Sequence, residues 1–148
     1  MEYTELGKGG PKVSRICLGS MTFGKSSDPS ITWLLNQEQT DEIVKRALDL
    51  GINFFDTANI YNEGTSEIFL GNSLKKYAKR EDIFVATKVF FNEGWLSKEG
   101  IFKQIDLSLK RLQMDYIDLY IIHRWDYSHP IEETMGALNE LIKGKKVR

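Results

Sequence analysis

Residues 82–89 read "DIFVATKV", a run of apolar and β-branched side chains that Lys88 interrupts near its end. The run is too continuous for a strand with one face in water, and it is typical of a strand buried on both faces. Such strands belong to parallel sheets that are covered by helices. The stretch therefore predicts an α/β fold.

Helical and strand patterns alternate on the C-terminal side of this strand. Ser97 can cap a helix whose apolar residues recur at helical spacing as far as Leu112. The stretch "YIDLYIIH" at 116–123 predicts a further strand of the same kind. Pro130 suits the first turn of a last helix, which has an apolar stripe and ends at Gly144.

The same alternation extends toward the N-terminus. The stretches "ICLGS" at 16–20 and "INFFD" at 52–56 predict two more strands. Between them, Asn36 can cap a helix that Gly51 stops. A further helical pattern covers 65–78. Four βα units in one continuous domain are therefore expected, with strand ends 32 to 37 residues apart.

A short β-hairpin is expected before these units. The stretches "YTEL" and "KVSR" flank the turn-rich "GKGGP" at 7–11. In the next strand, Cys17 stands in an apolar run, which favours a buried, reduced thiol over a disulfide or a metal ligand. Together with the absence of a leader pattern, this thiol predicts a cytoplasmic protein.

Composition argues against two classes of partner. The 20 basic and 21 acidic residues nearly balance, which gives no electrostatic reason to expect a nucleic acid or an anionic membrane as a partner. No apolar run approaches the ~20 residues needed to span a bilayer. The two histidines lack the neighbours of a metal ligand set, so no metal site is expected.

Polar residues stand where three of the predicted strands end. Parallel strands place their carboxyl ends on one side of a sheet, so Asp56, Lys88 and His123 should share a site, with Tyr61 on a loop beside them. Each residue alone has a plainer interpretation: a turn or cap for Asp56, a surface position for Tyr61, a solvent-reaching lysine, and a structural histidine.

Taken together, the four residues could form a site that donates a proton to a bound molecule. A phenol has a reference pKa of ~10 and is a poor acid near neutrality unless a cation stabilises its anion. Lys88 could be that cation, held in place by Asp56, while His123 donates a hydrogen bond to an oxygen beside Tyr61. A carbonyl oxygen that gains negative charge is what such donors would stabilise.

The sequence resembles the aldo-keto reductases along essentially its whole length. The motifs that carry the resemblance are "LGSMTFG" (18–24), "GINFFDTANIYNEGTSE" (51–67), "VATKV" (85–89) and "LKRLQMDYIDLYIIHRWD" (109–126). They are most similar to the branch of bacterial aldo-keto reductases and potassium-channel β subunits. Channel β subunits commonly carry another residue where this chain has His123, which favours an enzyme.

The resemblance implies NADPH-dependent reduction of aldehydes or ketones on a TIM barrel, with the catalytic residues Asp56, Tyr61, Lys88 and His123 and with Tyr61 as the proton donor. It also implies that the nicotinamide end of the cofactor contacts the first loop, at Gly19, Ser20 and Met21. A substrate pocket beyond the strands would be lined by Trp95, Arg124 and Trp125, together with Tyr127, although these could equally be packing residues.

A complete (β/α)8 barrel has ~250 residues, and the family would enter its fifth strand at "GKKVR" (144–148). We therefore expect residues 1–148 to be a partial domain, the N-terminal half of a barrel without the main cofactor-binding residues, and to have little or no activity alone. Its open sheet edges should self-associate or pair with a complementing half. A premature stop, a fragment, or a half that dimerises would all explain the length. The alternative function is a non-catalytic binding or assembly module, similar to a channel β subunit.

Overall fold

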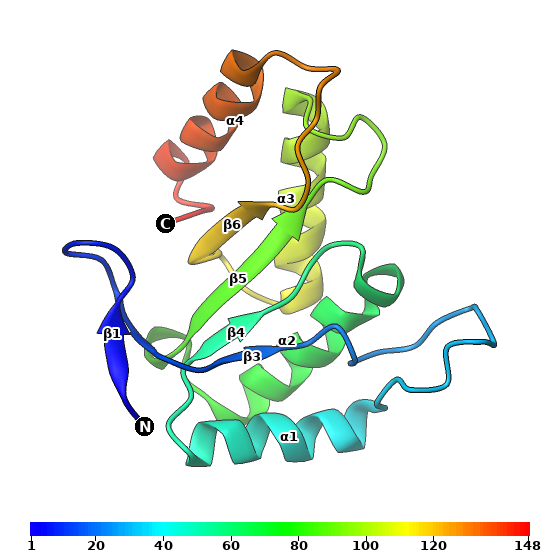
Figure 1. Ribbon diagram of the computed structural model, residues 1–148, viewed down its shortest axis with the longest axis vertical. Helices are drawn as coiled ribbons and strands as arrows, with labels where there is room; N and C mark the ends of the chain where they lie inside the picture. The colour runs from blue at the N-terminus through cyan, green and yellow to red at the C-terminus, as the bar shows by residue number, and fades with distance from the viewer.

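The computed structural model describes residues 1–148, and its main sheet has four parallel strands. Their spatial order, β3-β4-β5-β6, is also their order along the chain. The strands are β3 (Cys17–Gly19), β4 (Phe54–Asp56), β5 (Phe84–Val89) and β6 (Leu119–Ile122). Figure 1 shows them as neighbouring arrows, with α2 (Thr65–Tyr77) and α3 (Lys98–Leu112) behind them.

The remaining elements complete the predicted repeat. Helix α1 (Gln37–Asp49) connects β3 to β4, and α4 (Ile131–Lys143) follows β6. A short antiparallel hairpin, β1 (Tyr3–Glu5) and β2 (Lys12–Ser14), precedes the sheet. Two short 3₁₀ helices, η1 (Tyr61–Gly64) and η2 (Arg80–Asp82), lie in the connections. The predicted α/β fold, with four βα units after a hairpin, is confirmed.

The core lies between the sheet and the helices, because alternate strand residues point to opposite faces. In β4, Phe55 is fully buried in the core, whereas Phe54 and Asp56 lie half-buried on the other face. Five of the six residues of β5 are buried, as its sequence predicted. Helix α2 meets α1 on one side and α3 on the other, and Leu70 packs fully buried in this layer.

The helix ends follow the predicted signals. Asn36 and Gln39 form a complete capping box at the start of α1, in which each side chain bonds the other residue's backbone N–H. Gly51 follows α1 with φ +82°, a left-handed conformation that glycine adopts without strain. Ser97 caps α3 by accepting from the Gly100 N–H at 3.1 Å.

Helix α4 buries less of its apolar stripe than predicted. Leu141 is buried, but Ile131, Met135 and Ile142 remain 51%, 51% and 49% exposed. The reason is that α4 packs mainly against α3, which covers only one side of it. Pro130 stands directly before the first helical residue rather than inside the first turn.

The prediction that Cys17 is buried is wrong. Cys17 is exposed, because it lies on an edge strand and points away from Leu18, which packs against the core. Partial burial and the Asp56 carboxylate raise the pKa of the thiol to about 11, outweighing Lys88, which lowers it. The thiol is therefore protonated at neutral pH.

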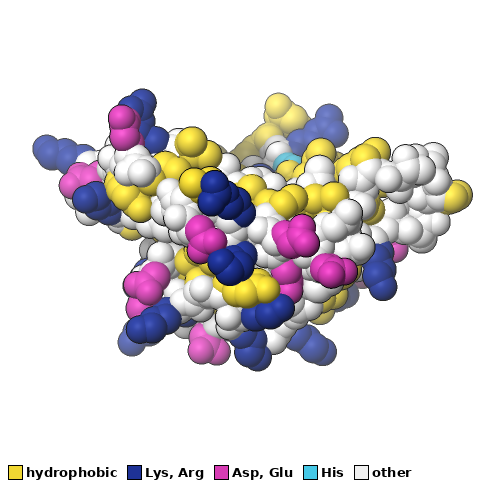
Figure 2. All heavy atoms as spheres, turned by 90° about the horizontal axis from the view of Figure 1, so that it is seen from below, with side chains coloured by type: hydrophobic (Ala, Val, Ile, Leu, Met, Phe, Trp, Pro, Cys, Tyr) yellow, Lys and Arg dark blue, Asp and Glu magenta, His cyan; other side chains and the backbone are white.

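The two outer strands leave backbone groups open at the sheet edges. Strand β3 has a partner only in β4. Beside β6, Val147 forms one parallel bridge with Ile117, in which the Ile117 N–H donates to the Lys146 carbonyl at 2.9 Å. In Figure 2, hydrophobic side chains form a band across the upper part of this face, and acidic and basic side chains are interspersed below the band and at its two ends. None of the helices combines the length and the apolar character that a membrane span requires.

Removing one partner of the buried ion pair behind β5 should destabilise the fold strongly. Glu67 is 0% exposed and pairs with Arg111 at 2.5 Å. Glu67→Ala should lower the free energy of unfolding by ~3–5 kcal/mol, because it leaves a half-buried guanidinium without its partner. Urea unfolding followed by circular dichroism measures this loss.

The matched control is Lys45→Ala, which breaks the exposed Lys45–Asp49 pair on α1. It should cost no more than ~1 kcal/mol. Equal losses of unfolding free energy in the two variants would show that breaking the buried pair costs no more than breaking the exposed pair.

Candidate functional site

Three of the four predicted catalytic side chains meet at the carboxyl ends of β4 and β5. The Lys88 ammonium donates to Asp56 Oδ2 at 2.5 Å, to the Thr57 carbonyl at 2.9 Å and to the Tyr61 hydroxyl at 3.3 Å. Lys88 Nζ also lies 4.9 Å from the centre of the Tyr61 ring. The ammonium thus connects a carboxylate to a phenol.

Strand register explains this meeting. Asp56 pairs with Ala86, so Lys88 stands two residues further along the neighbouring strand, on the same face of the sheet. A long lysine side chain can then lean across to the end of β4. Shifting the register by one residue would turn Lys88 toward the helices and break the contact.

A strained turn presents Tyr61. Immediately after it, Asn62 and Glu63 have φ values of 51° and 59°, a conformation that residues other than glycine rarely adopt. The Asn62 side chain donates to the carbonyls of Met21 and Phe23, both at 2.8 Å. These bonds attach the Tyr61 loop to the loop that follows β3 and stabilise the strained backbone.

His123 completes the group. Its ring meets the Tyr61 ring edge to face with centres 5.5 Å apart, and it meets the Phe91 ring in the same way at 5.2 Å. Burial lowers the pKa of His123, and the positive charge of Lys88 lowers it further, although Asp56 acts in the opposite direction. The imidazole is therefore neutral at neutral pH. Its buried Nδ1 has no hydrogen-bond partner.

The predicted first-loop residues differ in accessibility. Gly19 and Met21 are exposed, whereas Ser20 is fully buried. The Ser20 hydroxyl donates to the Asp56 carbonyl at 2.9 Å and contacts the Ser66 hydroxyl at 3.0 Å. Ser66 in turn contacts the Thr57 hydroxyl at 3.1 Å. The side chain of Ser20 thus connects the ends of β3 and β4 instead of facing the site.

A second buried network supports the Tyr61 loop from behind the sheet. The Thr87 hydroxyl donates to Glu67 Oε1 at 2.6 Å, and Arg111 donates to Glu67 Oε2 and to the Asn59 carbonyl. Gly64 lies so close that a Cβ there would come within 2.9 Å of Arg111 Nε. Sequence reasoning missed Ser66 and Glu67, although both lie in the "GTSE" part of a family motif.

The predicted pocket residues Trp95, Arg124 and Trp125 line one groove. Its volume is about 930 Å³, and its other lining residues are Phe90, Phe91, Asn92, Asp126, Tyr127 and Ser128. Phe91 joins the groove to His123 through their edge-to-face contact. The groove therefore lies next to the Tyr61 site, with Phe91 between its lining and His123.

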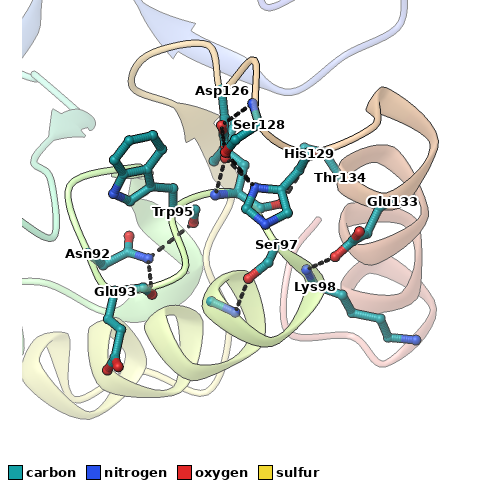
Figure 3. A network of polar contacts seen from close by, with 12 residues as sticks. Asn92, Glu93, Trp95, Ser97, Lys98, Asp126, Ser128, His129, Glu133 and Thr134 are labelled. Carbon is teal, nitrogen blue, oxygen red and sulfur yellow. Dashed lines mark hydrogen bonds and ion pairs between the residues drawn. The ribbon is translucent and has the colours of Figure 1, made fainter.

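One carboxylate fixes the two loops that form this groove (Figure 3). Asp126, whose side chain is 0% exposed, accepts from the Leu96 N–H at 3.1 Å and contacts His129 Nδ1 at 2.6 Å. Its other oxygen accepts from the N–H and hydroxyl of Ser128. Thr134 adds a bond to the Leu96 carbonyl at 3.1 Å. Burial would raise the pKa of Asp126, but these hydrogen bonds outweigh it and hold the pKa well below its usual range.

The sequence of this chain is similar to those of aldo-keto reductases and of channel β subunits. The aldo/keto reductase family model matches residues 15–148. The chain is 38% identical to the aldo-keto reductase YhdN of Bacillus subtilis, covering all of this chain and 45% of the relative. It is also 38% identical to a probable voltage-gated potassium channel subunit beta of Arabidopsis thaliana, covering 96% of this chain and 43% of the relative.

Solved structures agree with this. The thermostable aldo-keto reductase Tm1743 matches all of this chain with a TM-score of 0.86 and 33% identity, over 52% of its own chain. The aldo-keto reductase AKR11C1 from Bacillus halodurans matches with a TM-score of 0.84 and 36% identity, over 48% of its own chain. The predicted half-barrel is confirmed, and the chain spans about half the length of these relatives. With a family model that extends from Arg15 to the last residue, the chain belongs to the aldo/keto reductase family.

Proposed function

We propose that this chain supplies the proton-donating side of a carbonyl reductase site, in which aldehydes or ketones are reduced to alcohols with NADPH. The observation that carries the proposal is the Lys88 ammonium, 2.5 Å from Asp56 and 3.3 Å from the Tyr61 hydroxyl. A phenol beside a fixed cation is suited to give up its proton, because the cation stabilises the phenolate that remains.

The roles of the four residues follow from their positions. Tyr61 donates its proton to the carbonyl oxygen of the substrate, and neutral His123 donates a hydrogen bond to the same oxygen. Lys88 stabilises the charge that develops on the Tyr61 oxygen. Asp56, which touches only Lys88 within this group, keeps the ammonium in place.

The residues present fit the reacting end of the cofactor. A Cβ built at Gly19 would meet nothing within 4 Å, so the backbone beside exposed Met21 is open to a bound molecule. The buried Nδ1 of His123 lacks a partner, and a polar group of a bound molecule would satisfy it. NADPH, when bound, supplies the hydride that reduces the carbonyl carbon.

We further propose that residues 1–148 act as a partial domain that needs the second half of a barrel. The relatives it matches are about twice as long, and its outer strands β3 and β6 leave open edges. Alone, the chain should have little or no activity, because its fit to the cofactor is limited to the reacting end.

A second candidate function is an assembly module. It is supported by the similarity to potassium-channel β subunits and by the exposed apolar residues of α4. It predicts a stable complex that buries the open edges. Native mass measurement with and without NADPH detects this complex, and turnover of a carbonyl substrate separates the two functions, since an assembly module should form the complex without reducing the carbonyl.

Complementation tests the reductase function. The chain is co-expressed with the C-terminal half of a full-length relative, supplied as a separate polypeptide, and oxidation of NADPH is followed with para-nitrobenzaldehyde as substrate. The complemented protein should turn over, and Tyr61→Phe should abolish turnover while nucleotide binding is nearly unchanged, since only a hydroxyl is removed. Turnover that survives Tyr61→Phe would exclude Tyr61 as the proton donor.

The charge state of His123 is tested by titration. Nuclear magnetic resonance should give His123 a pKa below the reference value of ~6.5, because burial and Lys88 both disfavour its charged form. Lys88→Met should raise this pKa, because it removes a positive charge and leaves Asp56 unpaired. The signals that disappear from the spectrum of His123→Gln are those of His123. An unchanged or lower pKa in Lys88→Met would show that Lys88 does not act on His123.

A further inference from the structure

The groove next to the Tyr61 site has aromatic walls that begin at the catalytic group. Ring contacts run from Tyr61 to His123 at 5.5 Å, to Phe91 at 5.2 Å, then to Phe90 at 4.9 Å and to Trp95 at 5.6 Å. A flat ligand in the groove beside the catalytic group would therefore lie against aromatic side chains. Such surfaces favour an aromatic ligand body over a flexible aliphatic chain.

The same groove contains one positive charge that has no ion-pair partner. Arg124 lines it and is exposed, and its guanidinium forms no hydrogen bond and no ion pair. The only acidic residue among the lining residues is Asp126, whose carboxylate is fully buried and engaged by Leu96, Ser128 and His129. No lining residue forms an ion pair with Arg124, which leaves its guanidinium free to bind an anionic group.

The groove is formed in advance of binding. Asp126 joins the loop that carries Trp95 to the loop that carries Arg124 and Trp125, through its bond to the Leu96 N–H (Figure 3). The Asn92 side chain donates to the Trp95 carbonyl at 3.1 Å, which supports the left-handed backbone of Trp95 at φ 42°. The free-energy cost of ordering these side chains on ligand binding should therefore be small.

We propose that Arg124 and this aromatic groove form a subsite for an aromatic carbonyl compound that carries a carboxylate at the end opposite its carbonyl. The guanidinium forms two parallel hydrogen bonds to the carboxylate, and the ring of the ligand lies on the Trp95 and Trp125 side of the groove. The assignment of this ligand as a substrate rests on the proposed reductase function. Its binding to the subsite can be measured without catalysis.

The test compares para-acetylbenzoate with its methyl ester, which has nearly the same shape and no charge. Binding to the full chain is followed by quenching of tryptophan fluorescence. The acid should bind about tenfold more tightly than the ester, as expected of a charge-assisted bidentate contact. Arg124→Gln should remove the preference, and Arg124→Lys should retain part of it.

The matched control is Arg46→Gln on α1, which changes the net charge equally and lies outside the groove lining. It should leave the preference for the acid unchanged. Equal affinities for acid and ester, or a preference that survives Arg124→Gln, would overturn the proposal.

The complemented protein separates this proposal from the reductase function. If the complemented protein binds the acid more tightly than the ester but turns over neither compound, the reductase function is refuted and the subsite stands. Turnover with equal kcat/KM for acid and ester would refute the subsite and leave the reductase function standing.

Discussion

The contact between Lys88 and Asp56 is the interaction on which the candidate site depends. It joins the ends of two neighbouring parallel strands, and it places the ammonium 3.3 Å from the Tyr61 hydroxyl. Both partners are partly shielded from water, with side chains 14% and 27% exposed, so their attraction is screened less than that of a surface pair. Without this contact, the lysine would be free to extend into solvent and the phenol would lose its nearest cation.

The surrounding structure stabilises this contact from two sides. The hydroxyl network of Ser20 and Ser66 fixes the backbone of Asp56, and the Glu67–Arg111 pair supports the loop that leads to Tyr61. The first network bonds the Asp56 backbone, the second lies behind the sheet, and together they hold a loop that contains strained residues. Buried polar groups that are fully paired in this way favour one geometry over the alternatives.

Much of this could be predicted from the sequence, because buried strands and capped helices have local patterns. The order of the strands then follows from short connections, and with it the meeting of Asp56, Lys88 and His123 at one edge. Long-range contacts leave no such pattern. The exposure of Cys17 follows from its position on an open edge strand, and the role of Asp126 follows from a bond across 30 residues to Leu96. Neither could be derived from neighbouring residues.

A double-mutant cycle in the complemented protein tests the central claim most directly. The values of kcat/KM are measured for Asp56→Asn, Lys88→Met and the double variant. If Asp56 acts only by holding Lys88, the double variant should lose no more activity than Lys88→Met alone, within about twofold. Losses that multiply would show that the two residues act independently, which would contradict the account.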